Sequence, residues 1–180
     1  MQGTQRVTQE DRTSFYFAAS IALRGKVTVP IRKKRPLWTC PKCRHKFVTR
    51  NMWHSCGRYR VADHFKGKDP ITRKLFRAFK TLVRTIGPAT VYAQKTRIVF
   101  QTRARFAGVL VRKNRLEVGL WLKRRREHPR LYRIEFYPPS DYVHRIRLAH
   151  LAEIDRELAR FVREAYQVGR QEGPANERRV

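Results

Sequence analysis

Acidic residues are scarce in this sequence. It holds 14 Asp and Glu against 42 Lys and Arg, which gives a formal net charge of +28 at pH 7. The stretch from Arg12 to Ala62 contains no acidic residue at all. Such an excess repels itself in the folded chain and attracts polyanions. Nucleic acid is the commonest intracellular polyanion, so we expect it as the partner, and an acidic protein partner would also satisfy the charge.

Long apolar runs are also missing. None approaches the ~18 residues that a membrane-spanning helix needs, so we expect no membrane partner. The longest run, residues 14–23, carries Ala18, Ala19 and Ser20 inside it rather than after it, which does not fit a signal peptide. We therefore expect a cytoplasmic protein. We also expect residues 1–26 to be dispensable, with a possible start of translation at Val27.

Cysteine is absent outside one short segment. Cys40, Cys43 and Cys56 lie within seventeen positions, and an odd, clustered set is a poor disulfide framework but a good metal cluster. The turn Cys40-Pro41-Lys42-Cys43 can point two thiolates at one ion. His54 and Cys56 are two residues apart, so they share a face in an extended segment. The spacing predicts a structural zinc knuckle with Cys40, Cys43, His54 and Cys56 as ligands.

Two histidines are rival ligands at this knuckle. His45 lies two positions after Cys43, and His64 lies eight after Cys56. Trp38, Phe47 and Trp53 can cover so small a site. Four good ligands leave no open position for catalysis, and the sequence has no His-x-Glu of a zinc deaminase. The alternative is that the cysteines are buried free thiols beside a chance histidine.

The remaining pattern predicts an α+β domain. Asp69 and Pro70 begin an amphipathic helix over residues 70–86, which Gly87-Pro88 ends. Short apolar runs then predict an antiparallel sheet of about five to six strands, and a second helix follows near 151–168. The strands are expected at residues 90–94, 97–102, 106–111, 116–122, 131–137 and 142–148.

The domain boundaries follow from these elements. We expect a flexible basic extension over residues 1–37, the zinc knuckle over 38–60, the α+β domain over 62–170 and a disordered tail over 171–180.

Several stretches resemble one known family. They are Leu75-Phe76 through Ile86-Gly87, Lys95 to Phe100, Phe106 to Val109, Leu116 to Leu120, and Val143 to Leu148 with the helix that ends at Tyr166. From about residue 62 to 170 the chain is similar to the uncharacterised bacterial family of domain of unknown function 5655. A leader like residues 38–56 precedes the domain in one subgroup. The family implies no established activity; some members are fused to nuclease-like domains, which favours a nucleic-acid setting.

Basic clusters supply the candidate nucleic-acid contacts. Alternation over residues 97–105 predicts a cationic face above an apolar one, and arginine suits phosphate through its forked donors. Such contacts position a protein without reading sequence. The candidates are Arg32, Lys33, Lys34, Arg35, Lys42, Arg44, Lys46, Arg97, Arg103, Arg105, Lys123, Arg124, Arg125 and Arg126.

Catalysis has the least support. Asp63-His64 faintly resembles a His-Asn-His nuclease, but the next Asn and His are Asn114 and His128. Asp141 and His144 can form an acid–base pair, yet no nucleophile accompanies them. The acidic residues between 95 and 147 are too few to support a two-metal carboxylate site. They are Glu117, Glu127, Glu135 and Asp141. A protein-interaction or small-ligand domain remains the alternative to nucleic-acid binding.

Overall fold

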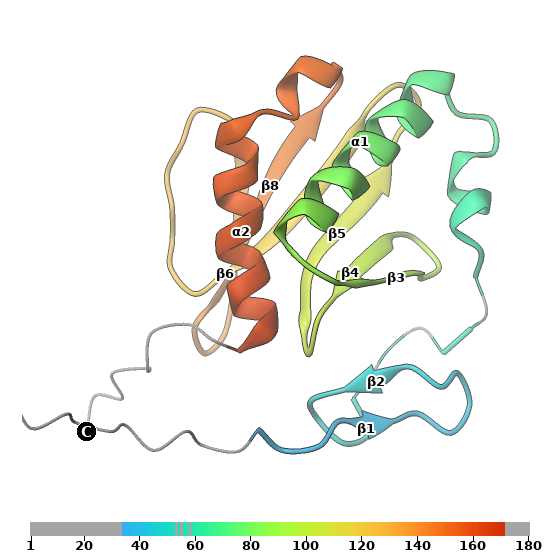
Figure 1. Cartoon of the computed structure of the whole chain (residues 1–180), viewed down its shortest axis with the longest axis vertical. Helices are drawn as coiled ribbons and strands as arrows, with labels where there is room; N and C mark the ends of the chain where they lie inside the picture. The colour runs from blue at the N-terminus through green and yellow to red at the C-terminus, as the bar shows by residue number, and fades with distance from the viewer. Residues whose placement is uncertain (1–33, 53, 55, 58, 172–180) are drawn as a thin grey trace, which may run out of the picture. The chain divides into compact units, whose positions relative to one another are not determined.

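A computed structural model describes residues 34–171 except 53, 55 and 58 (Figure 1). The chain divides into a unit that ends at Lys34 and a unit that begins at Arg35, and the fold below is that of the second unit. The expectations for residues 1–33 and for the tail from 172 lie outside the described residues. The elements are β1 Trp38–Thr39, β2 Lys46–Phe47, a 3₁₀ turn Val61–Phe65, α1 Pro70–Ile86, β3 Thr90–Ala93, β4 Ile98–Gln101, β5 Arg105–Val111, β6 Leu116–Leu122, β7 Leu131–Tyr137, β8 Asp141–Leu148, a 3₁₀ turn Leu151–Glu153 and α2 Arg156–Arg170.

Helix α1 begins and ends where its sequence predicts. The Asp69 side chain accepts a hydrogen bond from the Ile71 N–H at 2.8 Å, and Pro70 occupies the first position, where no N–H partner is needed. At the other end Gly87 approaches α2 closely. A Cβ at residue 87 would collide with the hydroxyl of Tyr166, which donates to the Pro88 carbonyl at 3.0 Å. This close contact joins the end of α1 to α2.

The six-stranded sheet is antiparallel, with strand order β3-β4-β5-β6-β8-β7. Figure 1 shows α1 and α2 side by side on one face of it. The prediction of an α+β fold with two helices, an antiparallel sheet and a preceding Cys/His segment is confirmed. In the described part of the chain, no helix is long and apolar enough to cross a membrane.

The core lies between the helices and one face of the sheet. The register places Val118 of β6 between Val109 of β5 and Ile146 of β8, so alternate residues of the central strands face the helices. Phe79 of α1 and Leu158 of α2 are fully buried against them. Truncating such a side chain to alanine costs about 2–5 kcal/mol of stability.

The opposite face of the sheet, called here the open face, carries different side chains. Gly108, Gly119 and Arg145 form one row across β5, β6 and β8. Near β3 and β4 this face contacts the Cys/His segment. The Gln101 amide donates to the Lys46 carbonyl at 2.6 Å, and the Tyr92 ring lies 4.2 Å from the His45 ring.

Two sequence predictions are corrected by the fold. The alternation over residues 97–105 does not run along one strand: β4 ends at Gln101, and the Thr102 N–H donates to the Ala104 carbonyl before β5 begins. The expected single cationic face over 97–105 is therefore wrong. The second helix begins at Arg156 rather than near 151, because the Asp155 side chain caps it by accepting from the Leu158 N–H at 2.8 Å.

Candidate metal centre

Four side chains meet at the N-terminal segment. The ligand atoms of Cys40, Cys43, His54 and Cys56 all lie within 4.8 Å of one another. The Cys40 and Cys56 sulfurs are 3.7 Å apart, and the Cys43 sulfur is 3.2 Å from His54 Nε2. Sulfurs bound to tetrahedral zinc at ~2.3 Å would be about 3.8 Å apart. The donor set and its spacing therefore fit a metal ion, as predicted from the sequence.

The turn between β1 and β2 positions the first two cysteines. The Cys40 N–H donates to the His45 carbonyl, and the Arg44 N–H donates to the Cys40 carbonyl, both at 2.9 Å. Closing this turn places Arg44 at a φ of 64°. A side chain at positive φ is strained, because Cβ crowds the backbone. The local geometry that brings Cys40 and Cys43 together therefore carries a small conformational cost.

A backbone contact fixes the orientation of His54. Its Nδ1 lies 2.6 Å from the Met52 carbonyl, and because a carbonyl only accepts, Nδ1 carries the proton. The lone pair then resides on Nε2, which faces the cluster. Metal-bound histidines usually have such a partner on the far nitrogen, since it holds the ring and its tautomer. The Phe47 ring packs 4.5 Å from the imidazole and is itself buried.

The thiols of Cys40 and Cys56 have pKa values shifted in opposite directions. Hydrogen bonds from the backbone at Cys43 and Lys42 lower the pKa of Cys40 from 9.0 to about 6, against the effect of burial. Desolvation of the sulfur and the neighbouring Cys40 thiol raise the pKa of Cys56 to about 11. A bound metal ion would remove this difference in pKa, because its positive charge stabilises every coordinating thiol as a thiolate.

The two rival histidines, His45 and His64, do not belong to the four-ligand set. His45 Nδ1 lies 3.3 Å from the Cys43 sulfur and outside the four-ligand set, and burial lowers the pKa of this histidine. His64 donates to the Gln94 carbonyl at 3.0 Å. Trp38 lies 6.1 Å from the Phe47 ring, so both cover the segment, whereas Trp53 lies outside the described residues.

The basic loop after β6 is largely neutralised by ion pairs. Arg124 and Arg126 both contact Glu164 of α2, at 3.0 and 2.7 Å. Lys123 pairs with Asp141 at 2.6 Å, and Arg125 pairs with Glu127 at 3.1 Å. Its role in nucleic-acid binding stays a prediction, made weaker by this pairing.

The other predicted basic residues lie apart from that loop. Lys42, Arg44 and Lys46 are exposed around the metal segment. Arg103 donates to the Gln171 side chain at 3.2 Å, and Arg105 lies 3.6 Å from the Met52 sulfur. Lys34 and Arg35 begin the described chain, while Arg32 and Lys33 lie outside it.

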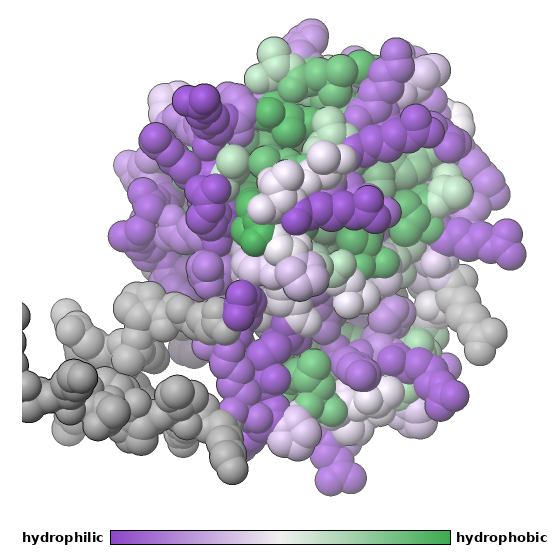
Figure 2. Space-filling model, in the orientation of Figure 1, coloured by the Kyte–Doolittle hydropathy of each residue, from purple (hydrophilic) through white to green (hydrophobic). Residues whose placement is uncertain are grey.

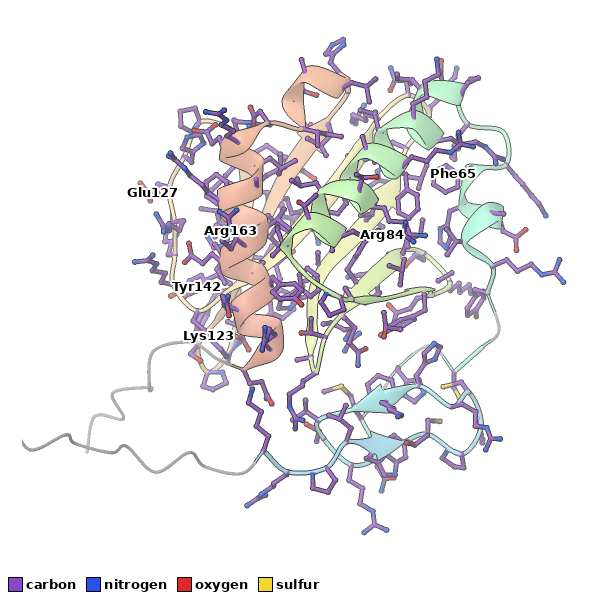
Figure 3. All side chains as sticks on the ribbon, in the orientation of Figure 1. Phe65, Arg84, Lys123, Glu127, Tyr142 and Arg163 are labelled. Atoms are coloured by element: carbon purple, nitrogen blue, oxygen red, sulfur yellow. The ribbon has the colours of Figure 1, made fainter. Side chains whose placement is uncertain are left out.

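Sequence reasoning missed a cationic surface on the helices. The cations of α1 and α2 recur every three to four residues, so each set follows one side of its helix, and all of them are exposed except Lys80, which is half-buried. Figure 3 marks Arg84 on α1 and Arg163 on α2. The spacing of three to four residues between these cations could have identified the surface from the sequence. We call this set the helix stripes: Arg73, Lys74, Arg77, Lys80 and Arg84 of α1, with Arg156, Arg160 and Arg163 of α2.

The acid–base pair considered from the sequence is not formed. Asp141 and His144 are three residues apart on β8, so they point to opposite faces of the sheet. Asp141 binds Lys123, while buried His144 accepts at Nε2 from the Arg126 N–H at 2.9 Å. The described residues therefore show no catalytic arrangement at this position.

The geometry defines a two-layer α+β domain with an N-terminal Cys/His metal segment. The family described as Domain of unknown function (DUF5655) matches residues 61–169, which is well over half of the chain. The chain belongs to this family, as its resemblance indicated. The match begins after the four candidate ligands. No curated protein and no solved structure matches the chain.

Proposed function

We propose that this protein is a zinc-stabilised module that binds nucleic acid through its phosphates, without sequence preference. The observation that carries the proposal is the lack of ion pairs, among the described residues, at four cations of the α1 stripe. Lys74, Arg77, Lys80 and Arg84 make no ion pair with any residue that the structure describes. Unpaired, regularly spaced cations are suited to a polyanion.

The helix stripes differ from the basic loop after β6 in how few ion pairs they make with described residues. Helix α1 contains no acidic residue. On α2, Glu157 and Glu164 pair with side chains of the loop after β6 and leave Arg160 and Arg163 unpaired among the described residues. Figure 2 shows hydrophilic side chains on this side of the molecule, with apolar areas between them.

Zinc is the metal that the donor set favours. Three thiolates and one imidazole in a closed site are typical of structural zinc. Such a site supplies folding free energy to a segment with little core of its own. Its exposed Lys42, Arg44 and Lys46 would add phosphate contacts at a second position.

Salt dependence tests the proposal. Binding to a mixed-sequence duplex should weaken roughly a thousandfold between 50 and 200 mM salt if ~6 phosphates are contacted. Replacing Arg77, Lys80 and Arg84 with Gln should reduce the slope of log affinity against log salt by about three. Glutamine keeps a good helix propensity, so α1 is retained.

The loop supplies the matched control for charge. Replacing Arg124, Arg125 and Arg126 with Gln removes the same formal charge, but these side chains are already paired. This variant should flatten the slope less than the stripe variant does. Equal effects would mean that net charge, not the helix stripes, carries binding. No binding to any nucleic acid at low salt would defeat the proposal and favour an acidic protein partner.

A further inference from the structure

A hollow lies between the C-terminal half of α1 and the two strands at one end of the sheet, β3 and β4. Its volume is about 220 Å³. Apolar cavities of about 150 Å³ admit benzene, so this space is large enough for one ring with a small substituent. The residues that line it are Lys80, Val83, Arg84, Ala89, Val91 and Phe100.

The places of these residues in the sequence explain how the hollow forms. The three from α1 are spaced as i, i+3 and i+4, so they lie on the same side of the helix. Val91 of β3 is paired with Phe100 of β4, so both side chains share the face of the sheet that packs against α1. Ala89 lies in the short connection between α1 and β3, and its single methyl group leaves the space beside it unfilled. The inner walls of the hollow are therefore apolar.

The charged side chains that line the hollow are both positive. Neither Lys80 nor Arg84 makes an ion pair with a residue that the structure describes. The sequence from Pro70 to Gln101, which supplies all the lining residues, contains no Asp or Glu. Figure 3 labels Arg84 beside α1, toward β3 and β4. An anion bound here would therefore meet two cations without competition from a carboxylate of the same segment.

We propose that this hollow binds a small organic acid, in which an apolar ring or a short branched chain carries one carboxylate. The apolar part would lie against the valine and phenylalanine side chains, and the carboxylate would pair with Lys80 and Arg84. Ligand sites commonly combine apolar walls with a few charged groups that orient the ligand, and the planar guanidinium of arginine suits a carboxylate. A nucleotide or a long acyl chain needs a larger space, because pockets for drug-sized ligands span about 300–1,000 Å³. The proposal goes beyond the proposed function and does not depend on it, although both use these two cations.

Benzoate is the probe that tests the proposal, observed through the methyl NMR signals of Val83 and Val91 in full-length, zinc-loaded protein. Benzoate should shift both signals saturably, with a dissociation constant in the millimolar range because the ligand is so small. Benzyl alcohol keeps the ring but lacks the charge, so it should bind about tenfold more weakly. Acetate keeps the charge but lacks the ring, so it should leave both signals unchanged. The proposal is overturned if benzoate causes no saturable shift, or if benzyl alcohol binds as tightly as benzoate.

Two pairs of matched variants locate the site. Ala89→Leu fills the hollow without changing any charge and should abolish benzoate binding, whereas Ala152→Leu adds the same group at an exposed position outside the hollow and should not. Arg84→Gln should weaken benzoate binding about three- to fivefold. Arg77→Gln removes the same charge from a part of α1 that does not line the hollow, and should change binding less than about twofold. Wild-type affinity for benzoate in both Ala89→Leu and Arg84→Gln would overturn the proposal.

Duplex binding separates this proposal from the proposed function. Ala89→Leu keeps every cation of the helix stripes, so it should lose benzoate binding and retain duplex binding. A wild type that binds benzoate but no nucleic acid would remove the proposed function and leave the organic-acid site intact. A wild type that binds duplex but shows no saturable benzoate shift would do the reverse.

Discussion

The side-chain amide of Gln101 donates to the main-chain carbonyl of Lys46 at 2.6 Å, a contact that spans 55 residues of sequence. The side-chain oxygen of Gln101 also accepts from the Tyr92 hydroxyl at 3.0 Å, and the side chains of both residues are buried. One glutamine of β4 thus links the metal segment to β3, because it pairs with the Lys46 carbonyl of the former and the Tyr92 hydroxyl of the latter.

Gln101→Met should destabilise the protein, because it leaves the Lys46 carbonyl and the Tyr92 hydroxyl without these partners. An orphaned buried polar group costs about 1–3 kcal/mol, and a loss of that size is expected in urea unfolding of the zinc-loaded protein, because the Tyr92 hydroxyl is buried whereas Lys46 is exposed. Gln167→Met on the exposed side of α2 is the control and should change stability by less than about 0.5 kcal/mol. An unchanged unfolding midpoint in Gln101→Met would show that this link is not needed.

Metal content is the second prediction. Protein purified without chelator should contain one zinc per chain, because the four ligands converge on one point. Cys43→Ala should release the metal, whereas Lys42→Ala, one residue away and exposed, should retain it. Metal analysis that finds less than about half an equivalent in the wild type would contradict the assignment.

Arg44→Gly should strengthen the metal segment. Glycine tolerates the φ of 64° that the turn imposes, whereas Arg44 pays for it in strain. Relief of about 1 kcal/mol would appear as roughly fivefold slower loss of zinc to a competing chelator. Lys42→Gly removes a charge from the same turn and serves as the control. Equal rates of zinc loss in wild type and Arg44→Gly would count against a strained turn.

Buried His144 should make stability depend on pH. Burial lowers its pKa below the ordinary 6.5, an effect that Arg125 reinforces, while Glu164 and the Tyr142 backbone oppose it. The unfolded chain therefore binds a proton that the folded chain does not, so stability falls as the pH drops below about 6.5. The slope from this group is at most about 1.4 kcal/mol per pH unit.

The variant His144→Gln isolates that contribution. Its side-chain oxygen can still accept from the Arg126 N–H, but it does not titrate. The difference in unfolding free energy between wild type and variant should shrink from pH 7 to pH 5, and contributions common to both proteins cancel. A difference that stays constant over this range would refute the assignment.

Local signals in the sequence were sufficient for α1 and for the metal ligands. Asp69, Pro70 and Gly87 determine the ends of α1 through short-range contacts, and the four ligands form two close pairs along the chain. Features that depend on distant partners were not predictable in this way. The break after Gln101 depends on how β5 pairs with β4, and Glu164 neutralises two arginines about forty residues away.

The fit between Gly87 and Tyr166 has a consequence for how this family can vary. Any residue larger than glycine at position 87 meets the Tyr166 hydroxyl, so the two positions constrain each other. Relatives that lose the glycine should also lose the tyrosine hydroxyl or shift α2. Aligned sequences should therefore show correlated substitution at this pair, and that correlation would identify chains that share the same helix contact.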